Sequence, residues 1–365
     1  LPNINTYACA LNACGNLKAP HYGRRIHVQI LKECLLEEKD NVAGNSLIDM
    51  YGKCGYLAKA QQVFDGLPCK NVISWTALIT GYADYQHYEK AIQCFLEMQL
   101  EGVSPDIVTL ACYLRACGSL GSLERGIDIH QAIERKGILE TNLIIGSSLV
   151  DMYAKCGMLD KAQKLFDELP IHDVDSWNSL MIGYAENGYG EEALISFEQM
   201  QIEGISPDAI TFSCSLRVCG SLGSIDKTCK IHNEIKRCRL FENDIVIARS
   251  LVDVYGKCGA SGKAQEIFDE LPRQDSVAWN SLIMGYADQG YDNEALKCFC
   301  EMRDKGLSPD AITYACVLKS CSNTGLAEKG MEIHAEAKKR GLLDNNIVLN
   351  TALVDMYAKC GMLEK

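Results

Sequence analysis

The stretch DMYAKCGML occupies residues 151–159, and the same nine letters return at residues 355–363. Two related versions, DMYGKCGYL and DVYGKCGAS, occupy residues 49–57 and 253–261. The Lys-Cys-Gly cysteine of each copy stands 102 residues after the previous one: Cys54, Cys156, Cys258 and Cys360. A fixed period of this kind is typical of a repeat architecture.

The 102-residue interval runs through the whole chain. Tryptophans, the prolines of Leu-Pro pairs and one set of histidines keep it: Trp75, Trp177, Trp279, Pro68, Pro170, Pro272, His130, His232 and His334. Each interval divides into three subunits, and each subunit has the pattern of two helices. The pattern is clearest in residues 143–173, where one apolar face leads to Gly157 and a second face leads to Pro170.

The two apolar faces of residues 143–173 follow helical spacing. The first consists of Leu149, Met152, Tyr153 and Cys156, and the second of Leu159, Ala162, Leu165, Phe166 and Leu169. A helix pair of this length cannot bury both faces by itself, whereas stacking on neighbouring pairs can do so. Because no strand-like alternation of period two is present, we expect an all-α superhelical solenoid of two-helix repeats.

Composition excludes several classes of function. The net charge of -12 argues against nonspecific polyanion binding, which needs many basic contacts. No apolar run approaches the 18 residues of a membrane span. The 19 cysteines are an odd number and include no Cys-x-x-Cys, so we interpret most of them as small buried thiols and expect no metal and no cofactor.

The subunits resemble the pentatricopeptide repeat family, and in particular its PLS subclass, in which standard (P), long (L) and short (S) motifs alternate. NVISWTALITGYADYQHYEKAIQCFLEMQLEGVSP is similar to a P motif, and NLIIGSSLVDMYAKCGMLDKAQKLFDELP to an S motif. The resemblance divides the chain into L 4–40, S 41–71, P 72–106, L 107–142, S 143–173, P 174–208, L 209–244, S 245–275, P 276–310, L 311–346 and a truncated S 347–365.

The resemblance implies a right-handed solenoid that binds single-stranded RNA in a sequence-specific way, one base per repeat. It further implies the recognition module of an organellar C-to-U RNA editing factor, acting in a mitochondrion or chloroplast. Small organellar editing-accessory proteins would contact the L motifs. A protein-binding helical-repeat scaffold is the alternative, and RNA of matched or scrambled sequence distinguishes the two. The chain begins at Leu1, so we expect it to be a segment of a longer array.

In the family, the fifth and the last residue of a motif bond to one base edge. The resemblance carries these roles to Asn45 with Asn71, Thr76 with Asp106, Ser147 with Asp173, Asn178 with Asp208, Ser213 with Asp244, Arg249 with Asp275, and Asn280 with Asp310. By the family's code, Thr or Ser with Asp implies guanine, Asn with Asp uracil, and Asn with Asn a pyrimidine, with cytosine favoured. Arg249 fits no standard combination. For any one pair, helix capping is the alternative interpretation.

Alanines occupy the fifth position of the other L motifs, at Ala8, Ala111 and Ala315, so these motifs stay unassigned. The second residue of a motif is expected to wedge between bases, and it is apolar at Ile73, Val108, Ile144, Ile210, Val246 and Val277. Asp175 breaks this pattern. A shuffled or engineered array would also be this self-similar, but the irregular Asp175 and Arg249 argue against it.

Two recurring charged sets have alternative interpretations. Lys53, Lys155 and Lys257 would either contact phosphate or favour the helix dipole at the end of a helix. His130, His232 and His334 have no accompanying nucleophile, so we expect packing roles and no enzymatic activity. In editing factors, deamination belongs to a downstream domain with His-x-Glu and Cys-x-x-Cys zinc signatures, and we expect no such domain in this chain.

The last predicted helix begins near Ile347. Its apolar face includes Leu353, Met356, Tyr357 and Cys360. The second helix of an S motif would normally cover this face, so we expect either fraying of residues 347–365 or burial of the face against another copy.

Overall fold

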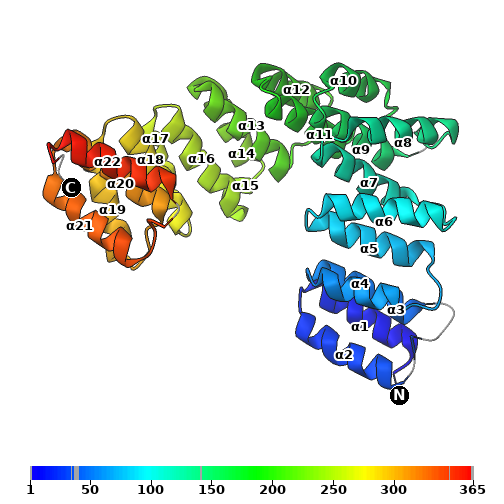
Figure 1. Cartoon of the computed structure of the whole chain (residues 1–365). Coiled ribbons are helices and arrows are strands. Elements are labelled where there is room, and N and C mark those ends of the chain that lie inside the picture. The colour runs from blue at the N-terminus through cyan, green and yellow to red at the C-terminus, as the bar shows by residue number, and fades with distance from the viewer. Residues whose placement is uncertain (1, 34, 37–40, 140–141, 345, 363–365) are drawn as a thin grey trace. The chain divides into compact units, whose positions relative to one another are not determined.

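The computed structural model describes residues 2–33, 35–36, 41–139, 142–344 and 346–362. Within these ranges the regular structure is entirely helical and no strand occurs (Figure 1). The prediction of an all-α helical-repeat fold is therefore confirmed. The chain divides into two units, Leu1–Asn187 and Gly188–Lys365. Parts of the predicted motifs at 37–40, 140–141 and 363–365 lie outside the described residues.

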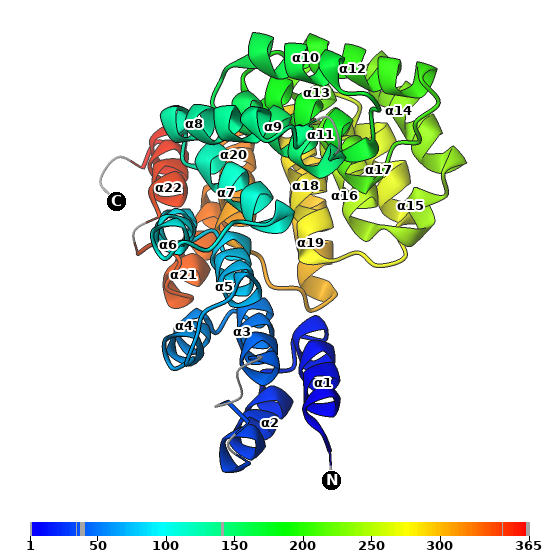
Figure 2. The ribbon, with the colours of Figure 1, turned by 90° about the vertical axis from the view of Figure 1, so that its right-hand side faces the viewer.

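The first unit is a stack of helix pairs in which each odd-numbered helix packs on the next odd-numbered one. Figure 2 shows α3, α5, α7 and α9 following one another in this way. The even-numbered helices pack on the odd-numbered helices beside them. The helices are α1 (Ile4–Asn16), α2 (Pro20–Lys32), α3 (Val42–Lys53), α4 (Leu57–Asp65), α5 (Val72–Asp84), α6 (Tyr88–Leu100), α7 (Ile107–Ser119), α8 (Leu123–Arg135), α9 (Leu143–Lys155), α10 (Leu159–Glu168) and α11 (Val174–Glu186).

The second unit repeats this stacking through α13, α16, α18, α20 and α22. A one-turn helix, α15, precedes α16, and the sequence pattern did not indicate it because four residues carry no periodicity. The helices are α12 (Gly190–Ile202), α13 (Ala209–Leu222), α14 (Ile225–Arg237), α15 (Leu240–Asn243), α16 (Ile245–Lys257), α17 (Ser261–Glu270), α18 (Ser276–Asp288), α19 (Asp292–Asp304), α20 (Ala311–Thr324), α21 (Ala327–Lys339) and α22 (Ile347–Lys359).

The tryptophans that keep the 102-residue interval lie in the core between successive helix pairs. Trp75 and Trp279 are each only 1% exposed. Each tryptophan meets a phenylalanine of the preceding helix edge-on, with ring centroids 4.5 Å apart for Phe64 and Trp75 and 4.6 Å apart for Phe268 and Trp279. The sequence therefore repeats at these positions because each interval forms the same core packing.

Small residues let the first helices of neighbouring motifs approach closely. A Cβ atom added to Gly285 of α18 would lie 2.9 Å from the Cα of Gly256 in α16. The equivalent pair in the first unit is Ala154 of α9 with Gly183 of α11, where an added Cβ on Gly183 would lie 2.3 Å from the Ala154 Cβ. One of the two facing positions must therefore stay glycine.

The cysteines of the described residues are free thiols, and about half of them are buried. Burial raises the pKa of the Cys94 and Cys298 thiols to about 12, as expected of thiols that pack as apolar groups. Four others, Cys9, Cys69, Cys238 and Cys300, are exposed, which the packing interpretation does not cover. No helix among the described residues is long and apolar enough to cross a membrane.

The expectation that this face of α22 needs a second helix or another copy to cover it is wrong for two of its four residues. Leu353 is 6% exposed and Met356 is fully buried. The Met356 side chain lies against Gly330 of α21, and α22 packs along α20. This face is thus covered by the preceding motif, whereas Val354, on another side of the helix, is 69% exposed.

Candidate functional site

In most of the predicted motifs, the last residue caps the first helix of the next motif. The side chains of these residues accept hydrogen bonds from backbone N–H groups at the helix start: Asn71, Asp106, Asp173, Asp208, Asp244, Asp275 and Asp310. In Asp173, for example, Oδ1 accepts from the Ser176 N–H at 2.8 Å. The capping role is therefore present at each of these positions. It uses one side-chain oxygen and leaves the second oxygen of each carboxylate for another partner.

In four motifs, the fifth residue reaches this capping residue. Asn280 Nδ2 donates to Asp310 Oδ2 at 2.8 Å, and Arg249 Nη1 donates to Asp275 Oδ2 at 2.7 Å. Thr76 Oγ1 lies 3.3 Å from Asp106 Oδ2, and Asn45 Nδ2 lies 3.5 Å from Asn71 Oδ1. A paired polar site thus forms at the junction of two successive motifs.

Within the described ranges, two of the other pairs predicted from the sequence do not show this contact between the fifth residue and the capping residue. Ser147 donates back to its own helix, at 3.1 Å from the Leu143 carbonyl, and makes no bond to Asp173. Ser213 likewise makes no hydrogen bond to Asp244 among the described residues. Asn178 belongs to the first unit and Asp208 to the second, so their pairing remains a prediction.

The Asn280–Asp310 pair has defined donors and acceptors. The Asn280 carbonyl oxygen accepts from the Thr313 hydroxyl at 2.5 Å, and Thr313 in turn is the third residue of the helix that Asp310 caps. One amide N–H of Asn280 donates to the carboxylate, and its second N–H is left over. Thr76 has the same surroundings, because its hydroxyl lies 2.7 Å from that of Thr109, in the helix that Asp106 caps.

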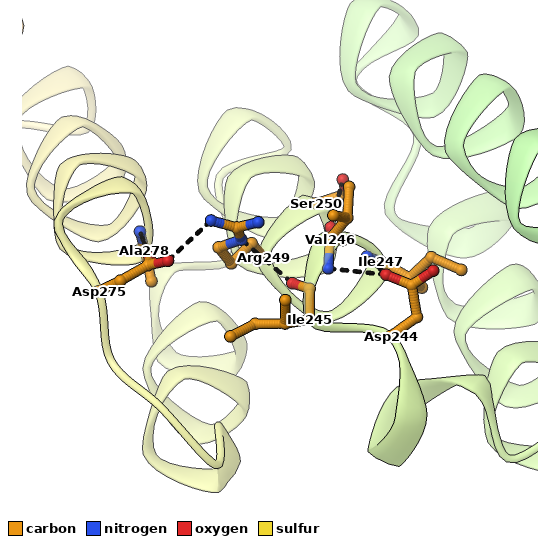
Figure 3. Close-up of polar contacts among 8 residues, drawn as sticks. All are labelled: Asp244, Ile245, Val246, Ile247, Arg249, Ser250, Asp275 and Ala278. Atoms are coloured by element: carbon orange, nitrogen blue, oxygen red, sulfur yellow. Dashed lines mark hydrogen bonds and ion pairs between the residues drawn. The ribbon is translucent and has the colours of Figure 1, made fainter. Parts of the chain in front are cut away.

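Arg249 is held by an ion pair (Figure 3). Besides the contact with Asp275, its Nε donates to the Ile245 carbonyl at 3.2 Å. The Asp275 carboxylate uses its other oxygen to cap α18 at the Ala278 N–H. The arginine thus occupies the place that Asn280 takes in the next motif, with more donors and a positive charge.

In both units, the second residues of most motifs are exposed aliphatic side chains. Their exposed fractions lie between 50% and 58% for Ile73, Val108, Ile144, Ile210, Val246, Val277 and Ile312. We did not single out Ile312, although the same position in the motif would have identified it. Exposed apolar side chains recurring at one place mark a contact surface. Asp175 is also exposed, so an acid interrupts this pattern.

The recurring lysines do not stand free for a ligand. The ammonium groups of Lys53, Lys155 and Lys257 lie 2.7, 2.9 and 2.7 Å from aspartates one turn earlier in the same helix. These partners are Asp49, Asp151 and Asp253. The contacts support the helix-end interpretation of the lysines over phosphate binding.

Each recurring histidine has a tyrosine partner that the sequence analysis missed. The Nδ1 atoms of His27, His130, His232 and His334 lie 2.8 to 3.1 Å from the hydroxyls of Tyr51, Tyr153, Tyr255 and Tyr357. The fixed spacing of His and Tyr could have revealed the pair. Burial lowers the pKa of all four histidines, that of His232 to about 4.

The letters His-x-Glu do occur, at residues 232–234 and 334–336. No group of three or more His, Cys, Asp or Glu side chains in the described part of the chain is arranged to hold a metal ion. The hydrogen bonds to Tyr255 and Tyr357 support a packing role for His232 and His334.

Matches to known repeats cover more than half of the chain. Residues 70–119, 172–221 and 274–323 match the PPR repeat family, and residues 45–72, 147–174, 246–275 and 312–342 match the PPR repeat.

The chain is similar to plant proteins of this kind. A chloroplastic pentatricopeptide repeat-containing protein of Arabidopsis thaliana is 33% identical over 363 residues, which are 100% of this chain and 58% of that protein. A mitochondrial one from the same plant is 33% identical over 356 residues, 97% of this chain and 51% of that protein. The chain thus spans about half the length of these curated relatives.

Among solved structures, the fold is similar to that of the pentatricopeptide repeat protein PPR10 from maize. The TM-score is 0.73 at 21% identity, covering 100% of this chain and 57% of that chain. For PPR10 in complex with an 18-nt psaJ RNA element, the TM-score is 0.67 at 20% identity, with 94% of this chain and 56% of that chain covered. From the matched repeats, the related proteins and the shared fold, it follows that this chain belongs to the pentatricopeptide repeat family.

Proposed function

We propose that the chain binds single-stranded RNA in a sequence-specific way, with one base at each polar junction between motifs. The observation that supports this proposal most directly is a recurring arrangement. The fifth residue of a motif contacts the residue that caps the first helix of the next motif, and exposed aliphatic residues lie beside this pair. An example in the second unit is the pair of Asn280 and Asp310 with their neighbour Val277. The RNA complex of PPR10, whose fold is similar, supports the same proposal.

The chemistry of the pairs accounts for base choice. A carboxylate accepts from a ring N–H, which uracil and guanine carry on their Watson–Crick edges and cytosine and adenine lack. The second amide N–H of Asn280 donates to a carbonyl of uracil beside Asp310. Thr76 with Asp106 takes guanine, as the family's code implies. The flanking aliphatic side chains pack against the faces of the bases, as apolar stacking platforms do in other single-strand binders.

A net charge of -12 is compatible with this mode of binding. Here affinity comes from base edges and base faces, and only a few contacts involve phosphate. The dependence on salt is then shallow compared with that of a basic protein.

The test uses the code in parallel register, from the second motif to the ninth. The matched RNA contains 5′-CGNGUGNU-3′, and the control contains the same letters scrambled. Because each mismatched base edge costs about 1–3 kcal/mol, the matched RNA binds at least about a hundredfold more tightly at the same salt concentration. Equal binding of both RNAs would overturn the proposal, and no RNA binding at all would favour a protein-binding scaffold.

We place the chain, more finely, in the recognition part of an organellar C-to-U editing factor. Relatives named chloroplastic and mitochondrial support a location in one of these organelles. Ala8, Ala111 and Ala315 leave their L motifs without a base-reading side chain, so these motifs are available to small editing-accessory proteins. Such a protein compacts the array and tightens RNA binding; unchanged scattering and affinity would count against this part.

A further inference from the structure

We propose that the motif spanning residues 245–275 selects cytosine through the Arg249–Asp275 ion pair. This inference rests on the proposed RNA binding. It concerns the motif that the family's code leaves unassigned, because an arginine stands where an amide or a hydroxyl is usual.

The arginine side chain is anchored and yet accessible. Its Nε donates to the Ile245 carbonyl at 3.2 Å and its Nη1 to Asp275 Oδ2 at 2.7 Å. The Arg249 and Asp275 side chains are 21% and 28% exposed. Figure 3 shows the guanidinium reaching from α16 toward Asp275 at the start of α18. An anchored donor group loses little further freedom when a ligand binds.

A count of donors and acceptors shows what the pair offers. A guanidinium has five N–H groups, and the two bonds above use two of them. The other three have no hydrogen-bond partner among the described residues. Asp275 Oδ1 accepts from the Ala278 N–H, whereas Oδ2 has a lone pair beyond the one that faces Arg249. The pair therefore presents several donors next to a single acceptor.

The neighbouring motif presents a different pattern. In the Asn280–Asp310 pair, one N–H of Asn280 remains, beside the acceptor oxygens of the amide and the carboxylate. The two motifs lie next to each other and share the same backbone arrangement. Their difference in base choice then comes from the fifth residue.

Cytosine complements the arginine pair. Its Watson–Crick edge has two adjacent acceptors, N3 and O2, for the guanidinium, and its amino group can donate to the Asp275 carboxylate. Uracil and guanine can donate their ring N–H to the Asp275 carboxylate, but each then offers the guanidinium a single adjacent acceptor, a carbonyl of uracil or O6 of guanine, where cytosine offers two. The other edge of guanine, O6 and N7, would suit Arg249 but would offer nothing to Asp275.

The base has a place between two aliphatic side chains. Val246 precedes Arg249 by almost one turn of α16 and is 53% exposed, and Val277 follows Asp275 and is 55% exposed. They stand at the same motif position as the other exposed aliphatic residues. Arg249 therefore acts within a complete junction, in which the arginine changes the hydrogen bonding and the charge and the flanking aliphatic residues are retained.

The experiment selects RNA from a fully randomised pool with the wild-type chain and with Arg249→Asn. The variant has the Asn–Asp combination of Asn280 and Asp310. We expect one position to change from cytosine to uracil, with a preference of about tenfold or more in each case, while the other positions stay the same. Arg249→Lys keeps the positive charge but loses the planar fork, so the cytosine preference falls while RNA binding persists.

The outcomes separate this inference from the proposed function. If neither protein enriches any sequence, the proposed RNA recognition itself is wrong. If both enrich the same sequence, or if the wild type shows guanine or no preference at the position that changes, the cytosine assignment is wrong while RNA recognition stands. Circular dichroism of both variants checks that the helices are retained.

Discussion

At the scale of single residues, one carboxylate stabilises the fold and also belongs to the proposed recognition site. Asp310 caps α20 through Oδ1, which accepts from the Thr313 N–H at 2.9 Å, and holds Asn280 through Oδ2. A residue required by the fold therefore also faces the proposed base. Helix capping and base recognition, which the sequence left as alternatives, are compatible.

This double role predicts different effects for two substitutions at Asp310. Asp310→Ala removes the cap and lowers the free energy of unfolding by about 0.5–2 kcal/mol, whereas Asp310→Asn keeps a capping oxygen and costs less. Both weaken the preference for uracil at the corresponding base, because the carboxylate acceptor is lost. Urea denaturation and RNA binding measure the two effects. Equal destabilisation by Ala and Asn would contradict the capping role.

Cys229 is a second residue whose surroundings change its chemistry. The Lys263 ammonium group donates to its Sγ at 3.1 Å and the Tyr255 hydroxyl at 3.6 Å. Burial raises the pKa of the thiol, but these hydrogen bonds and the lysine charge outweigh burial, and the pKa lies below its usual value. Lys161 is the equivalent lysine one interval earlier, where Ile127 replaces the cysteine.

We therefore expect Cys229 to react faster with iodoacetamide at pH 7 than the exposed thiols of Cys9 and Cys300, since the thiolate is the nucleophile. Lys263→Gln slows the reaction several-fold and moves its pH midpoint upward. Lys161→Gln is the matched control and leaves the rate unchanged. Peptide mapping after brief labelling gives the rates. A rate at Cys229 that ignores Lys263 would contradict the account.

At the scale of helices, packing distances set which positions accept a larger side chain. The sequence pattern correctly predicted the two helices of residues 143–173, seen as α9 and α10, and Gly157 ends the first with a φ of +76°. Leu149, Met152 and Tyr153 are fully buried, as the spacing indicates. The pattern could not reveal which helices approach most closely, because that depends on pairs of small residues far apart in sequence.

Two glycines at these close approaches are predicted to differ. Gly256→Ala recreates the Ala154–Gly183 combination of the first unit and changes the free energy of unfolding by less than about 1 kcal/mol. Gly183→Ala puts two Cβ atoms in conflict and destabilises by about 1–3 kcal/mol despite the better helix propensity of alanine. Denaturation of both variants measures the difference. Similar values for the two would refute the packing argument.

The helix pair of α14 and α16 carries a pH-dependent contact. His232 is hydrogen-bonded to Tyr255. Burial and the charges of Lys236 and Lys263 lower its pKa to about 4, although Glu270 acts in the opposite direction. In the unfolded chain the histidine titrates near about 6.5, so the unfolded state binds more protons between these values. The contribution of His232 to stability is therefore complete above about pH 6.5 and is lost as the pH falls toward about 4.

This predicts that the melting temperature declines between pH 7 and pH 5, and that His232→Gln makes the decline shallower. Glutamine can still hydrogen-bond to Tyr255, so the comparison concerns the slope rather than the stability at pH 7. His27, His130 and His334 are shifted in the same direction and leave a residual slope in the variant. An identical slope in both proteins would show that His232 is not held neutral.

At the scale of the whole molecule, the 102-residue interval determines the architecture and the site varies within it. The period and the helical spacing within it predicted stacked helix pairs, because core residues such as Trp75 and Trp279 must recur wherever the same packing recurs. The role of the fifth residues in base recognition was inferred from the family resemblance. The Arg249–Asp275 ion pair came from the structure, since nothing in the sequence shows that an arginine folds back onto the next motif's cap.

The central claim is that each junction reads one base, in the order of the motifs along the chain. Thr76 with Asp106 and Asn280 with Asp310 share the same surroundings, with Thr109 and Thr313 in equivalent places. They belong to motifs that lie six apart in the division of the sequence. A reciprocal exchange of the two fifth residues therefore tests the claim with matched controls.

The measurement is base preference at every position of a randomised RNA for the wild type, Thr76→Asn and Asn280→Thr. The account predicts that Thr76→Asn changes one position from guanine to uracil and that Asn280→Thr changes another from uracil to guanine. The two positions lie six nucleotides apart, with that of Thr76 on the 5′ side. The account would be contradicted if both variants changed the same position, if the two changed positions lay at any other separation, or if no position changed.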